Sequence, residues 1–251
     1  MRFLKQLGYG SIFLLILGSV GAGIYRVYFY EAPTCFDNIK NQDESEADCD
    51  GSCISCELKN AKLGTNAVSI IEAGGNKTTL MTVVSNPVNY SVNFEYRINV
   101  LGKFGTSLYA VNGFSSVGPR GERYIVIPGI GIPTSDAEKA NIEIIKMSWS
   151  EDEGARPRSV NVTDVETTLV DGSIRVTGKL FNDSLDIIER ARATAIIRDK
   201  DGNVLSASAV DVMGVGVSRE KAFTVFFPKL DLEVEIEETD TQVFGEVTPS
   251  L

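Results

Sequence analysis

The chain has 251 residues, of which 43 % are hydrophobic and 23 % charged, the proportions of a globular protein rather than a disordered one. Its formal net charge is −10 without any run of Lys and Arg, which excludes nucleic acid as a partner because its binding needs clustered basic side chains. The sequence contains no histidine, which removes Ser-His-Asp and Cys-His catalytic sites and every histidine-containing zinc site.

The segment Leu7–Tyr25 near the N-terminus contains no charged residue. As a helix it would extend about 28 Å, close to the ~30 Å of a bilayer's hydrocarbon core. Arg2 and Lys5 precede it, so the positive-inside rule places the N-terminus in the cytoplasm and the later residues outside. The sequence therefore predicts a cytoplasmic segment at 1–6 and a single transmembrane helix with an aromatic interface at 7–30. That interface consists of Tyr25, Tyr28, Phe29 and Tyr30.

A cleaved signal peptide is the main alternative for this segment. Val20-Gly21-Ala22 fits the small-residue rule for cleavage, and cleavage there would release a secreted binding protein. The apolar run is longer than the ~7–15 residues usual for a signal peptide, which favours an uncleaved anchor. A buried helix of a soluble domain is a further alternative.

A cysteine-rich module is predicted at 31–58. Its four cysteines are Cys35, Cys49, Cys53 and Cys56. Outside the cell cysteines oxidise, so two disulfides are expected, with three possible pairings that the sequence leaves open. A zinc site is the alternative, because Cys53-x-x-Cys56 has the required spacing, although Cys35 and Cys49 do not form a second close pair.

The same module is rich in acids, and Lys40 is the only basic residue among them. The acids are Asp37, Asp43, Glu44, Glu46, Asp48 and Asp50. Such crowding costs electrostatic repulsion unless a cation is bound, and Ca²⁺ prefers carboxylate and amide oxygens. A calcium ion is therefore predicted as a cofactor, although the spacing is not that of an EF-hand. The alternative is a solvated acidic loop without an ion. The residues assigned to calcium are Asp37, Asn41, Glu44 and Asp48.

The stretch resembles a short cysteine module of bacterial cell-surface and exported proteins, with the pattern C-x-D-x3-N-x2-E-x3-D-C-x-G-x-C-x2-C. It departs from the family at Asn38 and Asp50, where glycine is frequent. The resemblance covers about a tenth of the chain. It implies an exported protein and no particular activity. The matching positions are Cys35, Asp37, Asn41, Glu44, Asp48, Cys49, Gly51, Cys53 and Cys56.

From residue 60 onward, short alternating apolar segments separated by Gly, Asn and Asp turns predict β-strands. The order of these signals recurs after a polar link, Glu151–Arg158, and Asn86 and Asn182 stand at equivalent places, which indicates a duplicated domain. About seven strands in some 90 residues predict two immunoglobulin-like β-sandwiches, at 60–150 and 159–247. The clearest strands are Thr78–Val84, Val92–Val100, Arg123–Ile127, Ala140–Trp149, Ser173–Leu180, Arg190–Ile197 and Ala222–Phe227.

The second half resembles the FxLYD-type and late-embryogenesis-abundant-like β-sandwiches of envelope proteins over roughly residues 160–240. The shared features are Val176–Asn182, a strand ending in Asp199-Lys-Asp-Gly, and Phe223–Pro228. The chain departs from the family at Ile197, near which an aromatic residue would precede the turn. The resemblance implies a fold and an envelope location.

These observations predict a mainly β, non-enzymatic, single-pass membrane protein that exposes two β-sandwich interaction or structural domains outside the cell. Its predicted partners are the lipid bilayer and an envelope or surface protein. An accessory subunit of a secretion or pilus assembly is the alternative, with Gly18, Gly21 and Gly23 as a helix-packing face. Glycoside hydrolysis by paired acids is disfavoured, because the acids do not surround an evident cleft. The alternating acidic segment Leu230–Glu237 is interpreted as a protected edge strand, with docking of a basic partner as the alternative.

Overall fold

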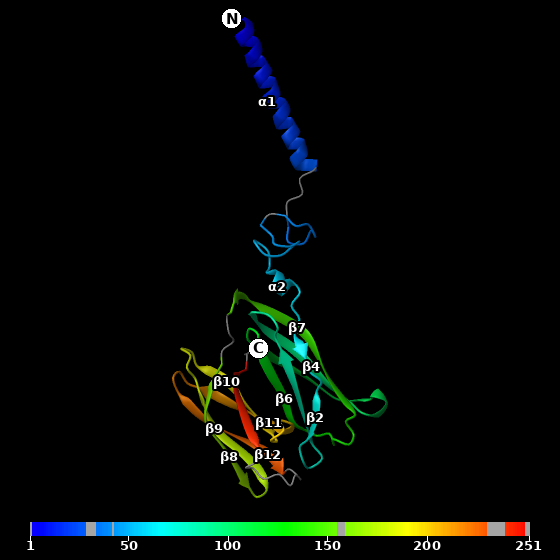
Figure 1. Cartoon of the computed structure of the whole chain (residues 1–251), viewed down its shortest axis with the longest axis vertical. Coiled ribbons are helices and arrows are strands. Elements are labelled where there is room, and N and C mark those ends of the chain that lie inside the picture. Colours follow the sequence, from blue (N-terminus) through cyan, green and yellow to red (C-terminus); the bar gives the residue numbers. More distant parts are fainter. Residues whose placement is uncertain (1, 29–33, 42, 155–158, 230–238, 249–251) are drawn as a thin grey trace. The chain divides into compact units, whose positions relative to one another are not determined.

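The computed structural model describes residues 2–28, 34–41, 43–154, 159–229 and 239–248 (Figure 1). The chain divides into two compact units, Met1–Asn60 and Ala61–Leu251. The first unit holds the helices α1 (Arg2–Tyr28) and α2 (Cys56–Lys59), and the second is built of β-strands. The prediction of a mainly β protein with an N-terminal apolar helix and two disulfides is confirmed.

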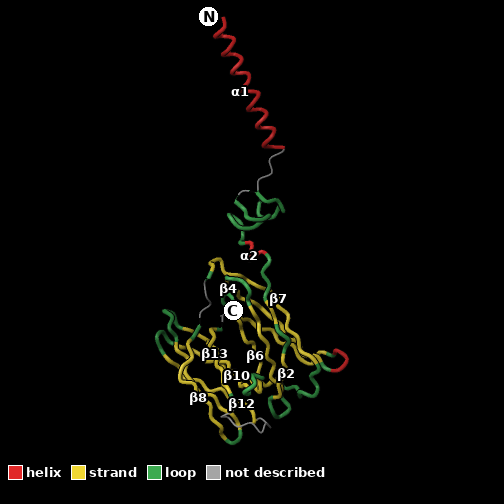
Figure 2. Tube along the Cα trace, in the orientation of Figure 1, coloured by secondary structure: helices red, strands yellow, loops and turns green. Residues whose placement is uncertain are grey.

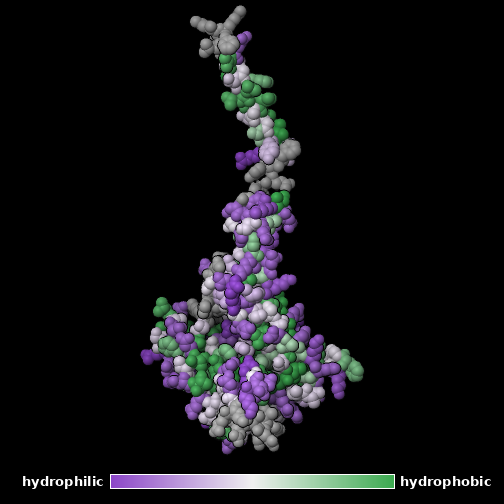
Figure 3. Space-filling model, viewed as in Figure 1, coloured by the Kyte–Doolittle hydropathy of each residue, from purple (hydrophilic) through white to green (hydrophobic). Residues whose placement is uncertain are grey.

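Helix α1 has the properties that membrane insertion requires. Within the described residues it is the one helix long and apolar enough to cross a bilayer, over Gln6–Tyr28, and none of that stretch is buried. Its 23 residues extend about 35 Å at 1.5 Å per residue. The space-filling view shows hydrophobic side chains along it (Figure 3). A signal sequence passes the same test, so the helix fits both interpretations. Of the predicted aromatic interface, Phe29 and Tyr30 lie outside the described residues.

The second unit contains four sheets, which form two pairs. Figure 2 shows its strands in yellow and the loops that join them in green. In the first sheet pair, one sheet has β3 at its centre with β6 on one side and β1 and β2 on the other, and the second has the order β5-β4-β7. A short 3-10 helix, Lys103–Gly105, joins β4 to β5. The strands are β1 (Gly64–Thr65), β2 (Ser69–Glu72), β3 (Thr78–Ser85), β4 (Tyr90–Leu101), β5 (Ser107–Val117), β6 (Glu122–Ile130) and β7 (Lys139–Glu153).

The second sheet pair has the orders β12-β9-β8 and β11-β10-β13. Each pair of sheets encloses its own hydrophobic cluster, an arrangement consistent with two β-sandwiches. Phe94 and Ile98 lie at the centre of the first cluster, and Phe227 and Leu180 in the second. The strands are β8 (Asn161–Val170), β9 (Ser173–Phe181), β10 (Ile188–Arg198), β11 (Val204–Val215), β12 (Glu220–Lys229) and β13 (Asp240–Val247).

Strand β3 over Thr78–Thr82 and strand β10 over Ala193–Ile197 are buried at every position, whereas β4 alternates between buried and less buried residues. The reason is a third hydrophobic cluster, the inter-pair interface, where the outer face of the β3–β6 sheet packs against the outer face of the β10–β11 sheet. Met81 and Val126 of the first pair meet Ile196 and Ala207 of the second there. A strand covered on both faces contains a nearly continuous apolar run instead of an alternation. Trp149 is partly buried and packs against the first core.

Two sequence-based expectations differ from the structure. The polar link Glu151–Arg158 was expected to lie outside the strands, but β7 continues to Glu153 because that residue pairs with Tyr90 of β4. The strongly polar β8 was also missed, since it is exposed along most of its length and carries little apolar alternation. The acidic segment Leu230–Glu237 lies outside the described residues.

Asn86 and Asn182 make the same hydrogen bonds in the two sheet pairs. The Asn86 side-chain N–H donates to the carbonyls of Tyr90 (2.7 Å) and Gly118 (2.8 Å), and its backbone N–H donates to Gly121. The Asn182 side chain donates to the carbonyls of Asp186 (2.8 Å) and Val215 (3.0 Å), and its backbone to Arg219. Each side-chain oxygen accepts the N–H two residues later, from Val88 or Ser184. Each sheet pair thus contains a buried asparagine with an equivalent set of partners, and domain duplication stays a prediction.

Candidate functional site

The four cysteines of the module form two disulfides, Cys35–Cys53 and Cys49–Cys56. Sequence reasoning predicted two bridges and left the pairing open. No cysteine is free, so none supplies the thiolate ligand that a zinc site would require. The bridges close loops with sequence separations of 18 and 7 residues, each worth roughly 3 kcal/mol or less in the chain-entropy model. The module therefore depends on cross-links more than on a hydrophobic core.

Asp48 is buried and holds the start of the module to its middle. Its carboxylate accepts the backbone N–H groups of Asp37 (2.9 Å) and Asn38 (3.0 Å). The Lys59 ammonium lies 3.5 Å from the same carboxylate and supplies a compensating charge. Because a buried carboxylate needs such partners, these contacts explain how Asp48 is accommodated with only 4 % of its surface exposed.

Asp37 and Asp50 are also acceptors for the backbone. Asp37 accepts the N–H groups of Thr34 (3.0 Å) and Ile39 (2.9 Å), and Asp50 accepts that of Cys56 (2.9 Å). These backbone hydrogen bonds hold the pKa of Asp37 and of Asp50 below the usual range, because they favour the ionised carboxylate. The acids thus take the place of the regular backbone pairing that this loop-rich segment lacks.

The two departures from the resembled pattern have a structural reason. Asn38 and Asp50 adopt φ angles of 57° and 63°, in the left-handed region where glycine has no steric cost. Asn and Asp are the other residues that most readily adopt this conformation. The backbone at both positions therefore favours glycine, asparagine or aspartate over other residues.

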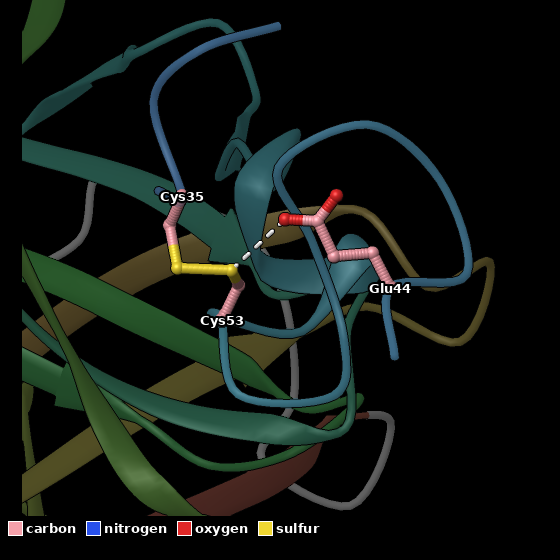
Figure 4. A group of neighbouring side chains, drawn as sticks. All are labelled: Cys35, Glu44 and Cys53. Atoms are coloured by element: carbon pink, nitrogen blue, oxygen red, sulfur yellow. Dashed lines mark hydrogen bonds between the residues drawn. A yellow bond between two sulfur atoms is a disulfide. The ribbon is translucent and has the colours of Figure 1, made fainter. Parts of the chain in front are cut away.

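Glu44 lies at the centre of the module and is only 5 % exposed. One carboxylate oxygen, Oε2, accepts the N–H groups of Asn41 and Asp48, each at 3.1 Å. The other oxygen, Oε1, lies 3.2 Å from the Cys53 Sγ in the Cys35–Cys53 disulfide (Figure 4). A disulfide sulfur carries no hydrogen, so this contact joins a carboxylate to a sulfur without a shared proton.

The four residues predicted to bind calcium do come together. Asn41 donates to the Asp37 carboxylate (3.0 Å) and to Glu44 through its backbone, and Glu44 in turn accepts the Asp48 N–H. Most of their carboxylate oxygens already accept N–H groups. The side-chain oxygen of Asn41 is different, because it is buried without a hydrogen-bond donor. Calcium binding stays a prediction, and Asn41 Oδ1 is the one orphaned oxygen within the predicted set.

A second candidate site lies between the two sheet pairs, where a small cavity of about 40 Å³ adjoins the inter-pair interface. The Arg123 guanidinium on β6 forms an ion pair with the Glu246 carboxylate on β13. Arg192 on β10 donates to the Val126 carbonyl (3.4 Å) and faces Asp211 at 3.8 Å. The polar residues that line the cavity include Tyr96, Ser115, Arg192, Thr194, Glu246 and Thr248.

The electrostatics of this cavity are set by burial. Desolvation raises the pKa of Glu246, although the neighbouring Arg123 and Arg192 guanidinium groups act in the opposite direction. Desolvation likewise raises the pKa of the Tyr96 hydroxyl. The volume accommodates a few water molecules but no organic substrate of ordinary size. No sequence signal identified these residues, because they meet from strands far apart in the chain.

Comparison with known proteins gives no family assignment. No family model matches the chain, and no curated protein matches it. Among solved structures, the exo-chitosanase CsxA of Amycolatopsis orientalis has a TM-score of 0.25 at 16 % identity and covers 72 % of this chain and 26 % of its own. Red sea bream transglutaminase has a TM-score of 0.23 at 12 % identity, with coverage of 74 % and 29 %. The chain therefore spans about a quarter of the length of these structures, and likeness at this level carries no argument about function.

Proposed function

We propose that this chain is a non-enzymatic, single-pass membrane protein that holds a disulfide-stapled module and two immunoglobulin-like β-sandwiches outside the cytoplasm. The observation that carries the proposal is α1, whose apolar residues over Gln6–Tyr28 are exposed, with none of that stretch buried. So much exposed apolar surface is unfavourable in water and favourable in lipid. The two disulfides add support, because such bonds persist outside the reducing cytoplasm.

The two sheet pairs are proposed as interaction or structural domains of an envelope protein, related to the FxLYD-type and late-embryogenesis-abundant-like sandwiches. Support comes from their sheet-on-sheet cores and from the inter-pair interface, which joins them into one compact unit. The cavity within the described residues is too small for an organic substrate. An accessory role in a secretion or pilus assembly remains the alternative and requires contacts through α1.

Anchoring predicts that the full-length protein stays in the membrane fraction after alkaline carbonate extraction. Its N-terminal sequence should begin at or near Met1, and protease added to cells with a permeable outer layer should remove the sheet pairs. The measurement combines extraction, N-terminal sequencing and protease mapping. A soluble product that begins just after Ala22 would show that the segment is a cleaved signal peptide and that the protein is secreted rather than anchored.

We further propose that a calcium ion binds the module at Asp37, Asn41, Glu44 and Asp48. The buried, unpaired Asn41 oxygen supports this, because an acceptor without a donor costs about 1–3 kcal/mol that a cation would recover. Thermal melting of the full-length protein in detergent should shift upward in calcium relative to chelator. The shift should disappear in Asn41→Ala and persist in Asp43→Asn, since Asp43 is an exposed acid outside the predicted set. Identical melting of the wild type under both conditions would refute calcium binding.

A further inference from the structure

The contact between Glu44 and a disulfide has a chemical consequence beyond the proposed function. Glu44 Oε1 lies 3.2 Å from Cys53 Sγ, and one of its carboxylate oxygens lies within 4.8 Å of both Cys35 Sγ and Cys53 Sγ. Figure 4 shows the carboxylate directed at the Cys53 end of the bridge. The hydrogen bonds from Asn41 and Asp48 fix this orientation, so the charge is held against the sulfur by the fold.

We propose that the Glu44 carboxylate protects the Cys35–Cys53 disulfide from reduction by thiols. In thiol–disulfide exchange a thiolate attacks one sulfur, the S–S bond breaks, and the other sulfur leaves as a thiolate with the bonding electron pair. A second thiol of the reagent then releases the mixed disulfide, which leaves two cysteine thiols and the oxidised reagent.

Attack by a thiolate on either sulfur of the Cys35–Cys53 bridge places a negative charge beside Glu44. Attack on Cys53 brings the incoming thiolate to the carboxylate, and attack on Cys35 expels a Cys53 thiolate into contact with it. Like charges at such a distance repel strongly where water is excluded, and Glu44 is buried. The surrounding acids add a weaker, solvent-screened repulsion of any anionic reagent.

The second disulfide provides an internal comparison. Glu46 lies within 4.8 Å of the Cys49 and Cys56 sulfurs, but it is exposed to solvent, which screens its charge. Accessibility alone predicts the opposite order of reduction, because Cys35 and Cys53 are both partly exposed, whereas in the second bridge only Cys56 is partly exposed and Cys49 is 1 % exposed. The two explanations can therefore be separated in the wild-type protein.

The experiment follows the reduction of each bridge in the full-length protein in detergent, with a calcium chelator present so that no cation neutralises the Glu44 carboxylate. Dithiothreitol is the reductant, and timed alkylation with peptide mass analysis reports each pair of cysteines. In the wild type, Cys35–Cys53 should be reduced more slowly than Cys49–Cys56. Glu44→Gln should accelerate reduction of Cys35–Cys53 roughly tenfold, the effect of removing one like charge from the attacked and leaving sulfurs. Glu46→Gln, with the same change in net charge, should alter either rate by less than about twofold.

Reoxidation distinguishes electrostatic protection from a merely structural role. If Glu44 acts through its charge, Glu44→Gln should also speed re-formation of Cys35–Cys53, because that reaction passes through the same thiolate. If Glu44 only holds the loop in place, the variant should lose the bridge faster and regain it more slowly, which would overturn the proposal. Should Glu44→Gln fail to fold, the wild-type comparison still decides, since faster reduction of Cys35–Cys53 than of Cys49–Cys56 contradicts the proposal.

Discussion

Replacing Arg123 with alanine is expected to destabilise the second unit by roughly 3–5 kcal/mol near neutral pH, because it leaves the Glu246 carboxylate buried without its ion-pair partner. Only 12 % of the Glu246 side chain and 15 % of the Arg123 side chain are exposed, so water cannot replace the lost contact easily. The measurement is urea-induced unfolding followed by circular dichroism, with the midpoint and slope compared between variant and wild type.

The loss should grow with pH. Burial raises the pKa of Glu246 in the folded protein above its unfolded value. A group with a raised folded pKa contributes stability that is complete below the unfolded pKa and is lost as pH rises through the folded pKa. Arg123 favours the ionised carboxylate, so without it the pKa rises further and the loss extends to higher pH. Unfolding at about pH 5 and about pH 8 should therefore show a larger deficit at the higher value.

Glu246→Gln is the matched control for this effect, because its side chain has a similar shape and does not titrate. The double variant Arg123→Ala/Glu246→Gln should lose less stability than Arg123→Ala alone, and its deficit should not depend on pH. A deficit in Arg123→Ala that is equal at both pH values, or larger at the lower one, would show that Glu246 is not the titrating group.

Asn182→Ala should cost roughly 3–5 kcal/mol, since it removes the side-chain hydrogen bonds to the carbonyls of Val215 and Asp186 and from the N–H of Ser184. Asn182 is fully buried and its bond to the Val215 carbonyl is buried too, so water does not easily replace it there. Urea unfolding measures the loss. Asn161→Ala is the control, because Asn161 is exposed and makes one side-chain hydrogen bond to Asp183, which predicts a change within about 0.5 kcal/mol.

The equivalent change in the first sheet pair, Asn86→Ala, should have a similar effect, because Asn86 makes the same bonds and is only 3 % exposed. A small loss at either position would mean that the shared bonds are incidental to stability. Equal, large losses at both would show that each sheet pair depends on its own asparagine to join the β3–β4 or β9–β10 connection to the rest of its sheets.

The fold was predictable where burial follows a local pattern. The alternation in Val92–Val100 identified the strand and its buried face, because one side of β4 faces the core and the other is less buried. The inter-pair interface was not predictable, since whether Met81 faces solvent or another sheet depends on strands more than a hundred residues away. A polar edge strand such as β8 also lacks the signal, because few of its side chains are buried.

For the cysteine-rich module, the sequence predicted which residues lie together but not what their side chains bind. The crowding of acids marked Asp37, Glu44 and Asp48 as working together, and the structure places them in one hydrogen-bonded group. Their use as acceptors for backbone N–H groups depends on left-handed turns at Asn38 and Asp50, which are not evident from charge and spacing. The polar residues that line the cavity around Glu246 could not be predicted from the sequence, because no motif or charge pattern beside Glu246 indicates which residues it contacts.

The inter-pair interface joins non-corresponding sheets: the β3 sheet of the first pair meets the β10 sheet of the second, whereas β3 corresponds to β9 and β4 to β10. Between identical units, such a head-to-tail contact generates a ring if the rotation closes and an open filament if it does not. The two halves of this chain are not identical at the positions that form the inter-pair interface. Thr177, five residues before Asn182, stands where the first pair has Met81, five residues before Asn86. The β9 sheet of the second pair therefore lacks the methionine that the β3 sheet contributes to the inter-pair interface, so the two halves do not carry the same contact surface.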